Sequence, residues 1–298
     1  MGVENILITD SNFGAFTRDL TIVDKIVESK KKTGYPHSLF ATWAKNSNDR
    51  VFKVSKKLKD NELGWGTTLS VQSMDEQVLN AIARKNIPLD NYKQLFERYA
   101  FHNIPTYSEI ILGLPLETKT SFINGLGNIL EITKGEVSEI RIWELFMTNS
   151  PVNSQREKYG IKTILAQQNK QEGHYDEIER KEIAVETNTL SSKDWVYCSN
   201  FGEFLLACHN GKVLRYLSKF LNEKKNIKYQ DFYKGVFDFV SKNSMKKYIS
   251  RCEEIFTDYQ RSGYDKMGNP IPANNKVAYQ KDIMKIYKKY KSTRPRIH

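Results

Sequence analysis

The sequence predicts an α/β fold, with a partial (β/α) barrel over residues 1–150 and a mainly helical, basic region over residues 151–298. Three observations support this prediction. Short β-type runs recur in the first half at intervals of about 28 to 40 residues, with helical periodicity between them. Two of these runs alternate polar and apolar side chains, and the excess of basic residues is confined to the second half.

Five β-type runs are expected to form the strands of the first half. They cover residues 5–9, 39–44, 67–72, 107–112 and 139–145. Helices are expected between and after them, over residues 17–32, 49–60, 74–85, 91–101 and 119–134. This alternation is typical of βα units that build a parallel sheet with right-handed connections. A capping box of Ser73 with Glu76, and an N-cap at Asp90, are expected to start two of the helices.

An open, doubly wound sheet and a curled barrel both fit this order, and the polarity of the strands favours the barrel. Polar or large side chains alternate with aliphatic ones: Thr68, Ser70 and Gln72 in the third run, Arg141 and Trp143 in the fifth. Strands of a doubly wound sheet are covered on both faces and read as continuous apolar runs. A polar face instead predicts a barrel interior that holds a polar ligand, with the active face at the carboxyl ends of the strands.

Composition and length limit the classes of protein. Of the 298 residues, 39% are hydrophobic and 27% charged, which is enough apolar material for one large or two medium domains. No apolar run is long enough to span a bilayer, and no signal sequence begins the chain. The spacing of Cys198, Cys208 and Cys252 fits neither a disulfide framework nor a metal clip. We therefore expect a soluble, cytoplasmic protein.

The net charge of +11 comes entirely from the second half of the chain. Residues 1–150 hold 18 Lys and Arg and 18 Asp and Glu, whereas residues 151–298 hold 28 and 17. Such an excess fits either an anionic partner or well-solvated, Lys-rich helices. Lys dominates over Arg, and no aromatic residues are interleaved in a nucleic-acid-binding pattern, so solvated helices are favoured and nucleic acid is not indicated.

The second half is expected to be helical near residues 175–190, 200–222, 229–241, 245–262 and 277–291. The last segment combines an apolar stripe with many lysines. It fits a terminal helix packed on the protein or a basic amphipathic helix that docks on an anionic surface.

Polar or Gly-rich segments follow each of the predicted strands. Asp10 and Asn12 follow the first strand, Ser73 follows the third, and Gly113 and Pro115 follow the fourth. Each of these residues has a local explanation as part of a turn or a cap. Because the carboxyl ends of parallel strands converge on one face, we expect these segments to gather around a common ligand.

Three segments carry a resemblance to a known family: residues 8–14 (ITDSNFG), 69–84 (LSVQSMDEQVLNAIAR) and 109–118 (EIILGLPLET). Together they resemble the radical S-adenosylmethionine (SAM) superfamily, in particular the branch whose members often carry a cobalamin-binding domain ahead of the barrel. The resemblance covers roughly residues 3–160. It implies a TIM-like partial barrel that holds SAM and a [4Fe-4S] cluster, and it leaves open whether cobalamin is used.

The resemblance also implies which residues bind SAM, position by position. They are Asp10, Asn12, Ser70, Gln72, Ser73, Glu109, Gly113, Leu114, Pro115, Trp143 and Leu145. Asp10 and Asn12 match the position near the amino and carboxylate groups of SAM. Ser70, Gln72 and Ser73 match positions that contact the ribose and the methionine carboxylate. The remaining positions match the surroundings of the adenine. The resemblance identifies no catalytic residue.

One departure from the family is large: the chain has no CxxxCxxC motif and no cysteine before Cys198. Thiolates hold such clusters, so we expect no metal ligands and no cluster in this chain. The chain also begins on what resembles the family's second strand, so residues 6–8 should form an open sheet edge.

Two functions follow as alternatives. The first is a radical SAM enzyme fragment, inactive by itself, whose N-terminal segment or upstream domain is missing and whose small-molecule or anionic substrate is unknown. The second is a non-catalytic βα binding or accessory module whose basic half binds an anionic partner.

Overall fold

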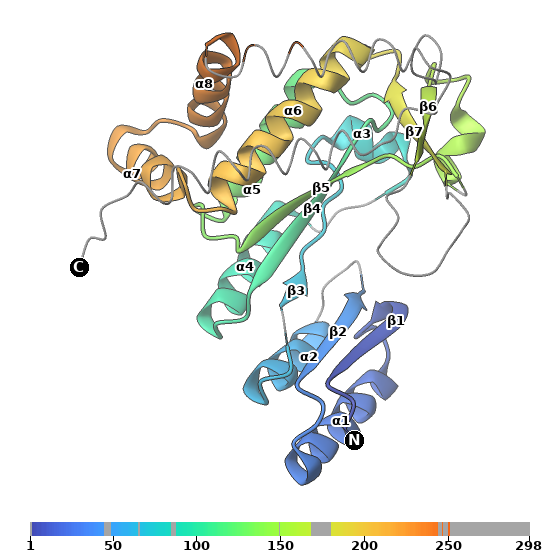
Figure 1. Ribbon diagram of the computed structural model, residues 1–298, viewed down its shortest axis with the longest axis vertical. Coiled ribbons are helices and arrows are strands. Elements are labelled where there is room, and N and C mark those ends of the chain that lie inside the picture. The colour runs from blue at the N-terminus through green and yellow to red at the C-terminus, as the bar shows by residue number, and fades with distance from the viewer. Residues whose placement is uncertain are drawn as a thin grey trace. The chain divides into compact units, whose positions relative to one another are not determined.

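The computed structural model describes residues 2–44, 49–64, 66–84, 88–148, 150–167 and 180–243, with residues 246 and 250 (Figure 1). The chain divides into two compact units, each drawn from several stretches of sequence. The first unit comprises residues 1–72, 85–110 and 129–141. The second comprises residues 73–84, 111–128 and 142–298.

The strand–helix alternation predicted for the first half is confirmed. The strands are β1 (Asn5–Phe13), β2 (Ser38–Trp43), β3 (Thr67–Thr68), β4 (Thr106–Leu112) and β5 (Glu139–Glu144). The helices are α1 (Thr17–Thr33), α2 (Asp49–Asp60), α3 (Glu76–Ala81), α4 (Leu89–Phe101) and α5 (Lys119–Ile132).

The strands lie side by side in the order in which they occur in the chain. β1 pairs in parallel with β2, and a parallel bridge joins Leu39 of β2 to Gly64, just before β3. β3 pairs in parallel with β4, and β5 is the next strand in that sheet. An order without reversal is that of a barrel wall, whereas a doubly wound sheet reverses at a switch point. Among the described residues the sheet stays open, since β1 has only β2 as a neighbouring strand. This confirms the predicted edge at residues 6–8.

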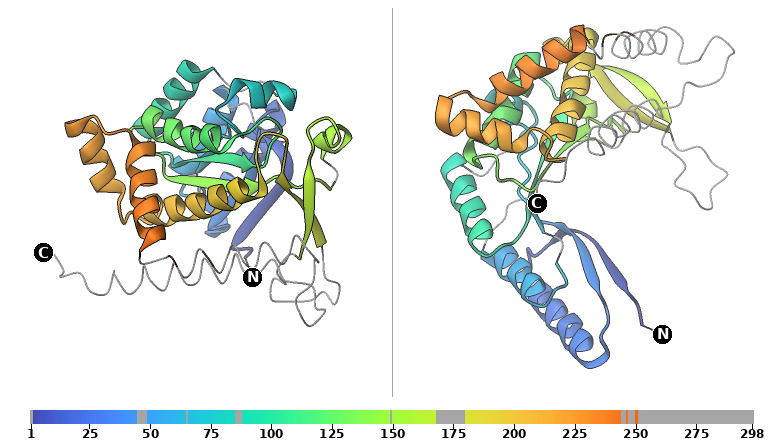
Figure 2. Two further views of the ribbon diagram at one scale, coloured as in Figure 1. Left: turned by 90° about the horizontal axis from the view of Figure 1, so that it is seen from above. Right: turned by 60° about the vertical axis from the view of Figure 1, so that its left-hand side comes forward.

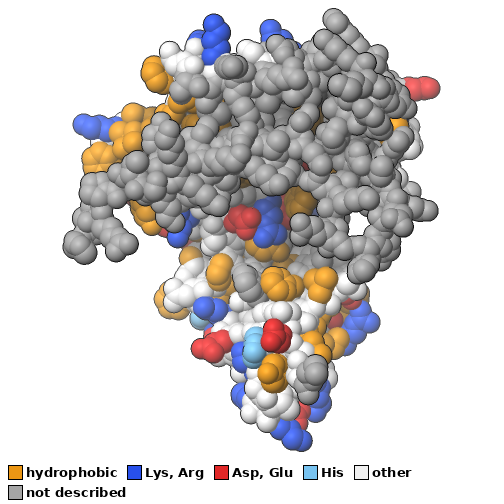
Figure 3. Space-filling view, in the orientation of Figure 1, with side chains coloured by type: hydrophobic (Ala, Val, Ile, Leu, Met, Phe, Trp, Pro, Cys, Tyr) orange, Lys and Arg blue, Asp and Glu red, His pale blue; other side chains and the backbone are white. Residues whose placement is uncertain are grey.

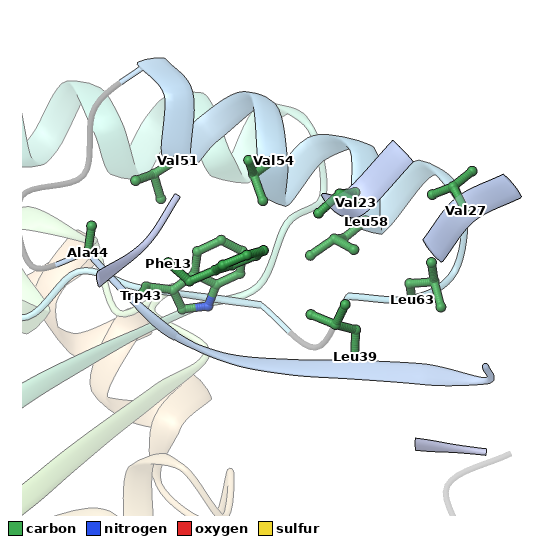
Figure 4. Packing of buried hydrophobic residues seen from close by; sticks show 10 residues of the cluster. All are labelled: Phe13, Val23, Val27, Leu39, Trp43, Ala44, Val51, Val54, Leu58 and Leu63. Carbon is green, nitrogen blue, oxygen red and sulfur yellow. The ribbon is translucent and has the colours of Figure 1, made fainter. Parts of the chain in front are cut away.

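Helices α1 and α2 cover one side of β1 and β2 (Figure 2) and enclose the hydrophobic core of the first unit. Figure 4 shows this core between α2 and β2. Its members are Phe13, Val23, Val27, Leu39, Trp43, Ala44, Val51, Val54, Leu58 and Leu63. The spacing of three and four residues along α2 places Val51, Val54 and Leu58 on one stripe, which is why this segment buries a single face.

The alternation predicted for the third run is confirmed. Leu69 and Val71 are buried, whereas Thr68, Ser70 and Gln72 between them are only half-buried. Regular strand pairing covers just Thr67–Thr68, and the run continues to a parallel bridge between Gln72 and Ile110 of β4. β4 alternates in the same way over all of its seven residues.

The second half contains a β-hairpin that the sequence analysis missed. After the 3₁₀ helix η1 (Pro151–Gln155), strand β6 (Lys162–Gln167) pairs antiparallel with β7 (Arg180–Glu186). The predicted helix over 175–190 is therefore wrong for residues 180–186. Backbone hydrogen bonds join Met147 to Glu182 and Ala184 to Leu145, so pairing with the chain beyond β5 overrides local helix propensity.

The other predicted helices of this half are confirmed where the structure describes them. They are α6 (Ser192–His209), α7 (Arg215–Lys225) and α8 (Tyr229–Lys242). The segment predicted at 200–222 is thus two helices with a break between them. The segments predicted at 245–262 and 277–291 lie outside the described residues, apart from residues 246 and 250.

Two predicted helix caps are wrong. Asp75, and not Ser73, is the N-cap of α3, because its carboxylate accepts hydrogen bonds from the amides of Gln77 and Val78. Asp90 lies inside the first turn of α4, which begins at Leu89 after Pro88. Pro88 is the N-cap residue, and its side chain has no hydrogen-bond acceptor, so α4 begins without a side-chain cap.

On the face that Figure 3 shows, basic and acidic side chains are interspersed over the part built of β1, β2, α1 and α2. This agrees with the even balance of charges in the first half. No helix among the described residues has the length and apolarity needed to cross a membrane.

Gly66 directly precedes β3, and its replacement tests the close approach of this segment to β4. Its φ is +126°, and an added Cβ would lie 2.6 Å from the carbonyl oxygen of Pro105. We expect Gly66→Ala to lower the free energy of unfolding by about 1–3 kcal/mol, measured by urea denaturation. Gly235→Ala is the control, because a Cβ there meets no atom within 4 Å and alanine favours the helix α8. Equal stability of Gly66→Ala and the unsubstituted chain would contradict this account of the turn.

Candidate functional site

One pocket of about 460 Å³ lies on the open face of the sheet in the first unit. Residues of β1 to β5 and the segments beside them line it. Its polar side chains include Ser11, Thr68, Ser70, Gln72, Glu109 and Arg141. Apart from Ser11, which is exposed, these side chains are half-buried and alternate with buried ones along their strands, so most of the polar lining lies on the face opposite the core, while Leu39 and Trp43 contribute to both.

Three of the residues predicted to bind a ligand meet in this pocket: Ser70, Gln72 and Glu109. They come from β4 and from the run that pairs with it. The backbone fixes their positions, because the amides of Val71 and Gln72 both donate to the carbonyl oxygen of Glu109, at 3.2 and 3.0 Å. Gln72 has a φ of +57°, a conformation that costs a non-glycine residue free energy and is held here by this pairing.

The guanidinium of Arg141 lies on the side of the pocket that β4 and β5 form. Arg141 Nη2 donates to Glu139 Oε2 at 3.0 Å, and the guanidinium carbon lies 3.9 Å from the centre of the Tyr107 ring. Burial lowers the pKa of Arg141, but the hydrogen bond to Glu139 and the charges of Glu139 and Glu109 outweigh it, and the pKa ends above its usual value. The pocket is therefore lined by two carboxylates and one permanently charged guanidinium.

Asp10 and Asn12 lie in β1, in an irregular stretch of its pairing with β2 between Ile8 and Phe13. The carboxylate of Asp10 accepts a hydrogen bond from the Asn12 amide at 3.0 Å and pairs with Arg18 at 2.8 Å. Asn12 donates to Ser11 Oγ at 3.2 Å. Both side chains thus hold the local shape of the strand, and their neighbour Ser11 is the one that lines the pocket.

Ser73 belongs to the second unit, where it contacts a buried acid. Its hydroxyl lies 3.4 Å from Glu117 Oε1, and the Ser121 hydroxyl donates to the same oxygen at 3.2 Å. Glu117 is fully buried, and its Oε2 meets no hydrogen-bonding group of the described residues. Burial raises the pKa of Glu117 to about 8, and Asp75 adds to this effect while the two serines oppose it. Glu117 is therefore protonated at neutral pH and connects the segments that follow β3 and β4.

The other predicted residues of the second unit are placed by packing. Gly113 has a φ of +97°, and a Cβ there would lie 3.0 Å from the carbonyl oxygen of Ala184. Leu114 and Leu145 are buried in one hydrophobic cluster, and Pro115 is also buried. Trp143 is 47% exposed.

The described cysteines do not suit an iron–sulfur cluster. Cys198 and Cys208 both lie in α6, and burial raises the pKa of both thiols, that of Cys208 to about 12. Clusters are held by thiolates, which these environments disfavour. No group of three or more His, Cys, Asp or Glu side chains within the described ranges is arranged to hold a metal ion.

The sequence analysis missed several pocket residues, among them Trp43, Tyr107, Glu139 and Arg141. For Tyr107, Glu139 and Arg141, the sequence contains a pattern that predicts their position on the pocket face. The two-residue period that selected Ser70 and Gln72 on one run selects Tyr107 with Glu109 on β4, and Glu139 with Arg141 on β5. Trp43 is largely buried in the core, and only the fold reveals that it also borders the pocket.

Two curated proteins are similar to this chain over most of its length. It is 43% identical over 290 residues to the cobalamin-dependent radical SAM methyltransferase TokK of Streptomyces tokunonensis. It is 38% identical over 290 residues to the 2-(S-pantetheinyl)-carbapenam-3-carboxylate methyltransferase of Streptantibioticus cattleyicolor. Each alignment covers 94% of this chain and 41% of the relative, so the chain spans about two fifths of the length of the curated relatives it matches.

A solved structure with some likeness is the radical SAM methyltransferase TsrM from Kitasatospora setae, with tryptophan and a SAM analogue bound. The TM-score is 0.45 at 12% sequence identity, and the match covers 65% of this chain and 41% of that one. No protein-family model matches the chain.

The buried acid Glu117 predicts how stability depends on pH. Its pKa is about 8 in the folded chain, against an ordinary value of 4.5, so the folded state holds the proton more tightly. Stability is therefore greatest below pH 4.5 on account of this group, and falls as the pH rises from there to about 8, by roughly 1.4 kcal/mol for each unit of pH. We expect Glu117→Gln to remove this fall, which denaturant titrations at about pH 5 and pH 8 would measure.

Glu182→Gln is the matched control for this measurement. Its hydrogen bond to Arg156 lowers the pKa of Glu182, so its contribution to stability is lost as the pH falls. Glu182→Gln should therefore leave the fall between about pH 5 and pH 8 in place. A Glu117→Gln variant that keeps the full pH dependence of the unsubstituted chain would show that Glu117 is ionised in the fold.

Proposed function

We propose that the pocket binds SAM for methyl transfer to a small-molecule carboxylate. The chain aligns over 94% of its length with a cobalamin-dependent radical SAM methyltransferase and with a carbapenam-3-carboxylate methyltransferase. One observation carries the proposal. Ser70, Gln72 and Glu109, three residues to which the family resemblance assigns SAM contacts, line a single pocket on one face of the sheet.

The size and the charge of the pocket support SAM as its ligand. A volume of about 460 Å³ lies in the range of pockets for small ligands and is far too small for cobalamin. At neutral pH, SAM carries a sulfonium, an ammonium and a carboxylate, and thus one net positive charge. The lining carries two carboxylates and one guanidinium, and thus one net negative charge. We propose that cobalamin, where it takes part, is bound by other residues of the protein.

Different residues that line the pocket are suited to bind different parts of SAM. The hydroxyl of Ser70 and the amide of Gln72 can donate to and accept from the ribose hydroxyls. The carboxylate of Glu109 is an acceptor for the ammonium group and an attractive charge for the sulfonium. Phe40 and Trp43 offer aromatic surface to the adenine. When bound, SAM supplies the group that is transferred.

The class of methyl acceptor comes from the relatives. One of them is named for a carbapenam-3-carboxylate substrate, and we propose a small carboxylate of that type for this protein. We also propose that the five strands form part of a partial (β/α) barrel, because their order follows the chain and their polar face encloses the pocket.

The two described cysteines, Cys198 and Cys208, do not fit a [4Fe-4S] cluster, because burial raises the pKa of both thiols. We propose that these 298 residues bind SAM but do not carry out radical chemistry by themselves. The support for this is the absence of a CxxxCxxC motif and the raised pKa of the two described thiols.

Calorimetric titration with SAM tests the proposed site. We expect one SAM to bind per chain, and Ser70→Ala and Gln72→Ala each to weaken binding about threefold to thirtyfold, because each removes hydrogen bonds to the ligand. Ser29→Ala is the control, since Ser29 is exposed on α1 and does not line the pocket. Binding that is absent, or equal in all variants, would contradict the proposal.

Anaerobic incubation with iron and sulfide tests whether the chain can hold a cluster. We expect the purified chain to acquire no visible thiolate-to-iron charge-transfer absorbance, because it has only three cysteines and burial raises the pKa of the two described thiols. A stoichiometric [4Fe-4S] spectrum that disappears in a Cys198→Ser and Cys208→Ser variant would overturn this part of the proposal.

A further inference from the structure

Among the described residues that line the pocket, Arg141 is the one basic side chain, and its environment leaves it able to bind a ligand. Among the described residues, its guanidinium makes one hydrogen bond, through Nη2 to Glu139, and one ring contact, with Tyr107. The Nε and Nη1 donors are not used by those contacts. The side chain is 37% exposed, so the group is accessible from the pocket.

The two contacts hold the guanidinium in one orientation. Glu139 lies two residues before Arg141 on β5, so both side chains project from the same face of the strand. The guanidinium carbon lies over the ring of Tyr107, which belongs to the neighbouring strand β4. A planar, oriented fork of N–H donors is the geometry that binds a carboxylate through two parallel hydrogen bonds.

Arg141 is also separated from Ser70 and Gln72, two of the three pocket residues assigned to SAM, whereas the third, Glu109, lies on the neighbouring strand β4. Ser70 and Gln72 lie on the run beside β3, with β4 between that run and β5. The pocket therefore offers hydroxyl and amide groups at one side and a cation at the other. A carboxylate that enters the pocket can therefore form its strongest interaction with the guanidinium of Arg141 on β5.

We propose that Arg141 binds the carboxylate of the small molecule on which the protein acts, with Tyr107 and Glu139 as the residues that orient it. This inference rests on the proposed function and adds the residue that recognises the acceptor. SAM itself carries a carboxylate, so the same chemistry has two sources. The test must separate the methyl acceptor from SAM.

Calorimetric titration of the full 298-residue chain with four probes makes this separation. The probes are 2-(S-pantetheinyl)-carbapenam-3-carboxylate, its methyl ester, SAM and decarboxylated SAM. We expect Arg141→Gln to weaken binding of the carbapenam acid at least about tenfold and to leave its ester unchanged. Arg141→Lys should recover part of the loss, because lysine keeps the charge without the fork.

Arg98→Gln is the matched control. Arg98 belongs to the same unit, pairs with Asp49, stacks 3.8 Å from the centre of the Phe52 ring and is 40% exposed, but it does not line the pocket. Its loss should change no affinity. Glu139→Gln should tighten binding of the acid, since it removes a negative charge beside the anchor, whereas a purely structural ion pair would give no such gain.

The results of these titrations distinguish the role of Arg141 from the binding of SAM by the pocket. A loss confined to the carbapenam acid supports Arg141 as the acceptor's anchor. A loss confined to SAM, absent for decarboxylated SAM, would overturn the inference, because the carboxylate at Arg141 would then be that of SAM. If Arg141→Gln binds all four probes as the unsubstituted chain does, or if the unsubstituted chain never prefers an acid to its uncharged form, the inference is overturned. A chain that binds the acid through Arg141 but does not bind SAM would overturn the proposed function alone.

Discussion

The two-residue period of the strands in the first unit is the constraint on which the pocket depends. Along the third run, Leu69 and Val71 are buried, and Ser70 and Gln72 face the pocket. Because successive side chains point to opposite faces, a slip of one residue would bury the polar set and expose the apolar one. The burial of the core therefore also fixes the polar lining. Stability and ligand binding use opposite faces of one sheet.

Electrostatics distinguishes the two units. In the first unit, the pocket keeps its charged groups partly exposed and paired, as with Arg141 and Glu139. In the second, Glu117 is fully buried, pairs with no cation among the described residues and has a raised pKa, with Ser73 and Ser121 as partners of one oxygen. The first arrangement suits a ligand with charges of both signs. The second is a neutral link that fixes a Gly- and Pro-containing segment, and it costs stability as the pH rises from about 4.5 to about 8.

Sequence reasoning was most successful where periodicity is strong. The alternation of Thr68, Ser70 and Gln72 predicted the pocket face, and Tyr107 and Arg141 follow from the same rule. Sequence reasoning was less successful where the local conformation, or the direction of a side chain, depends on contacts with residues far away in the sequence. The irregular stretch in β1 leaves Asp10 paired with Arg18 while Ser11 lines the pocket. The hairpin of β6 and β7 likewise forms because β7 pairs with the chain beyond β5, which no local pattern reveals.

The most direct test of the central claim, that the polar face of this sheet is the SAM site, is hydrogen–deuterium exchange of the chain with and without SAM. We expect SAM to slow exchange in residues 66–72, 105–109 and 138–141, which contribute the pocket wall. Protection confined to residues of the second unit, or no protection at saturating SAM, would contradict the claim.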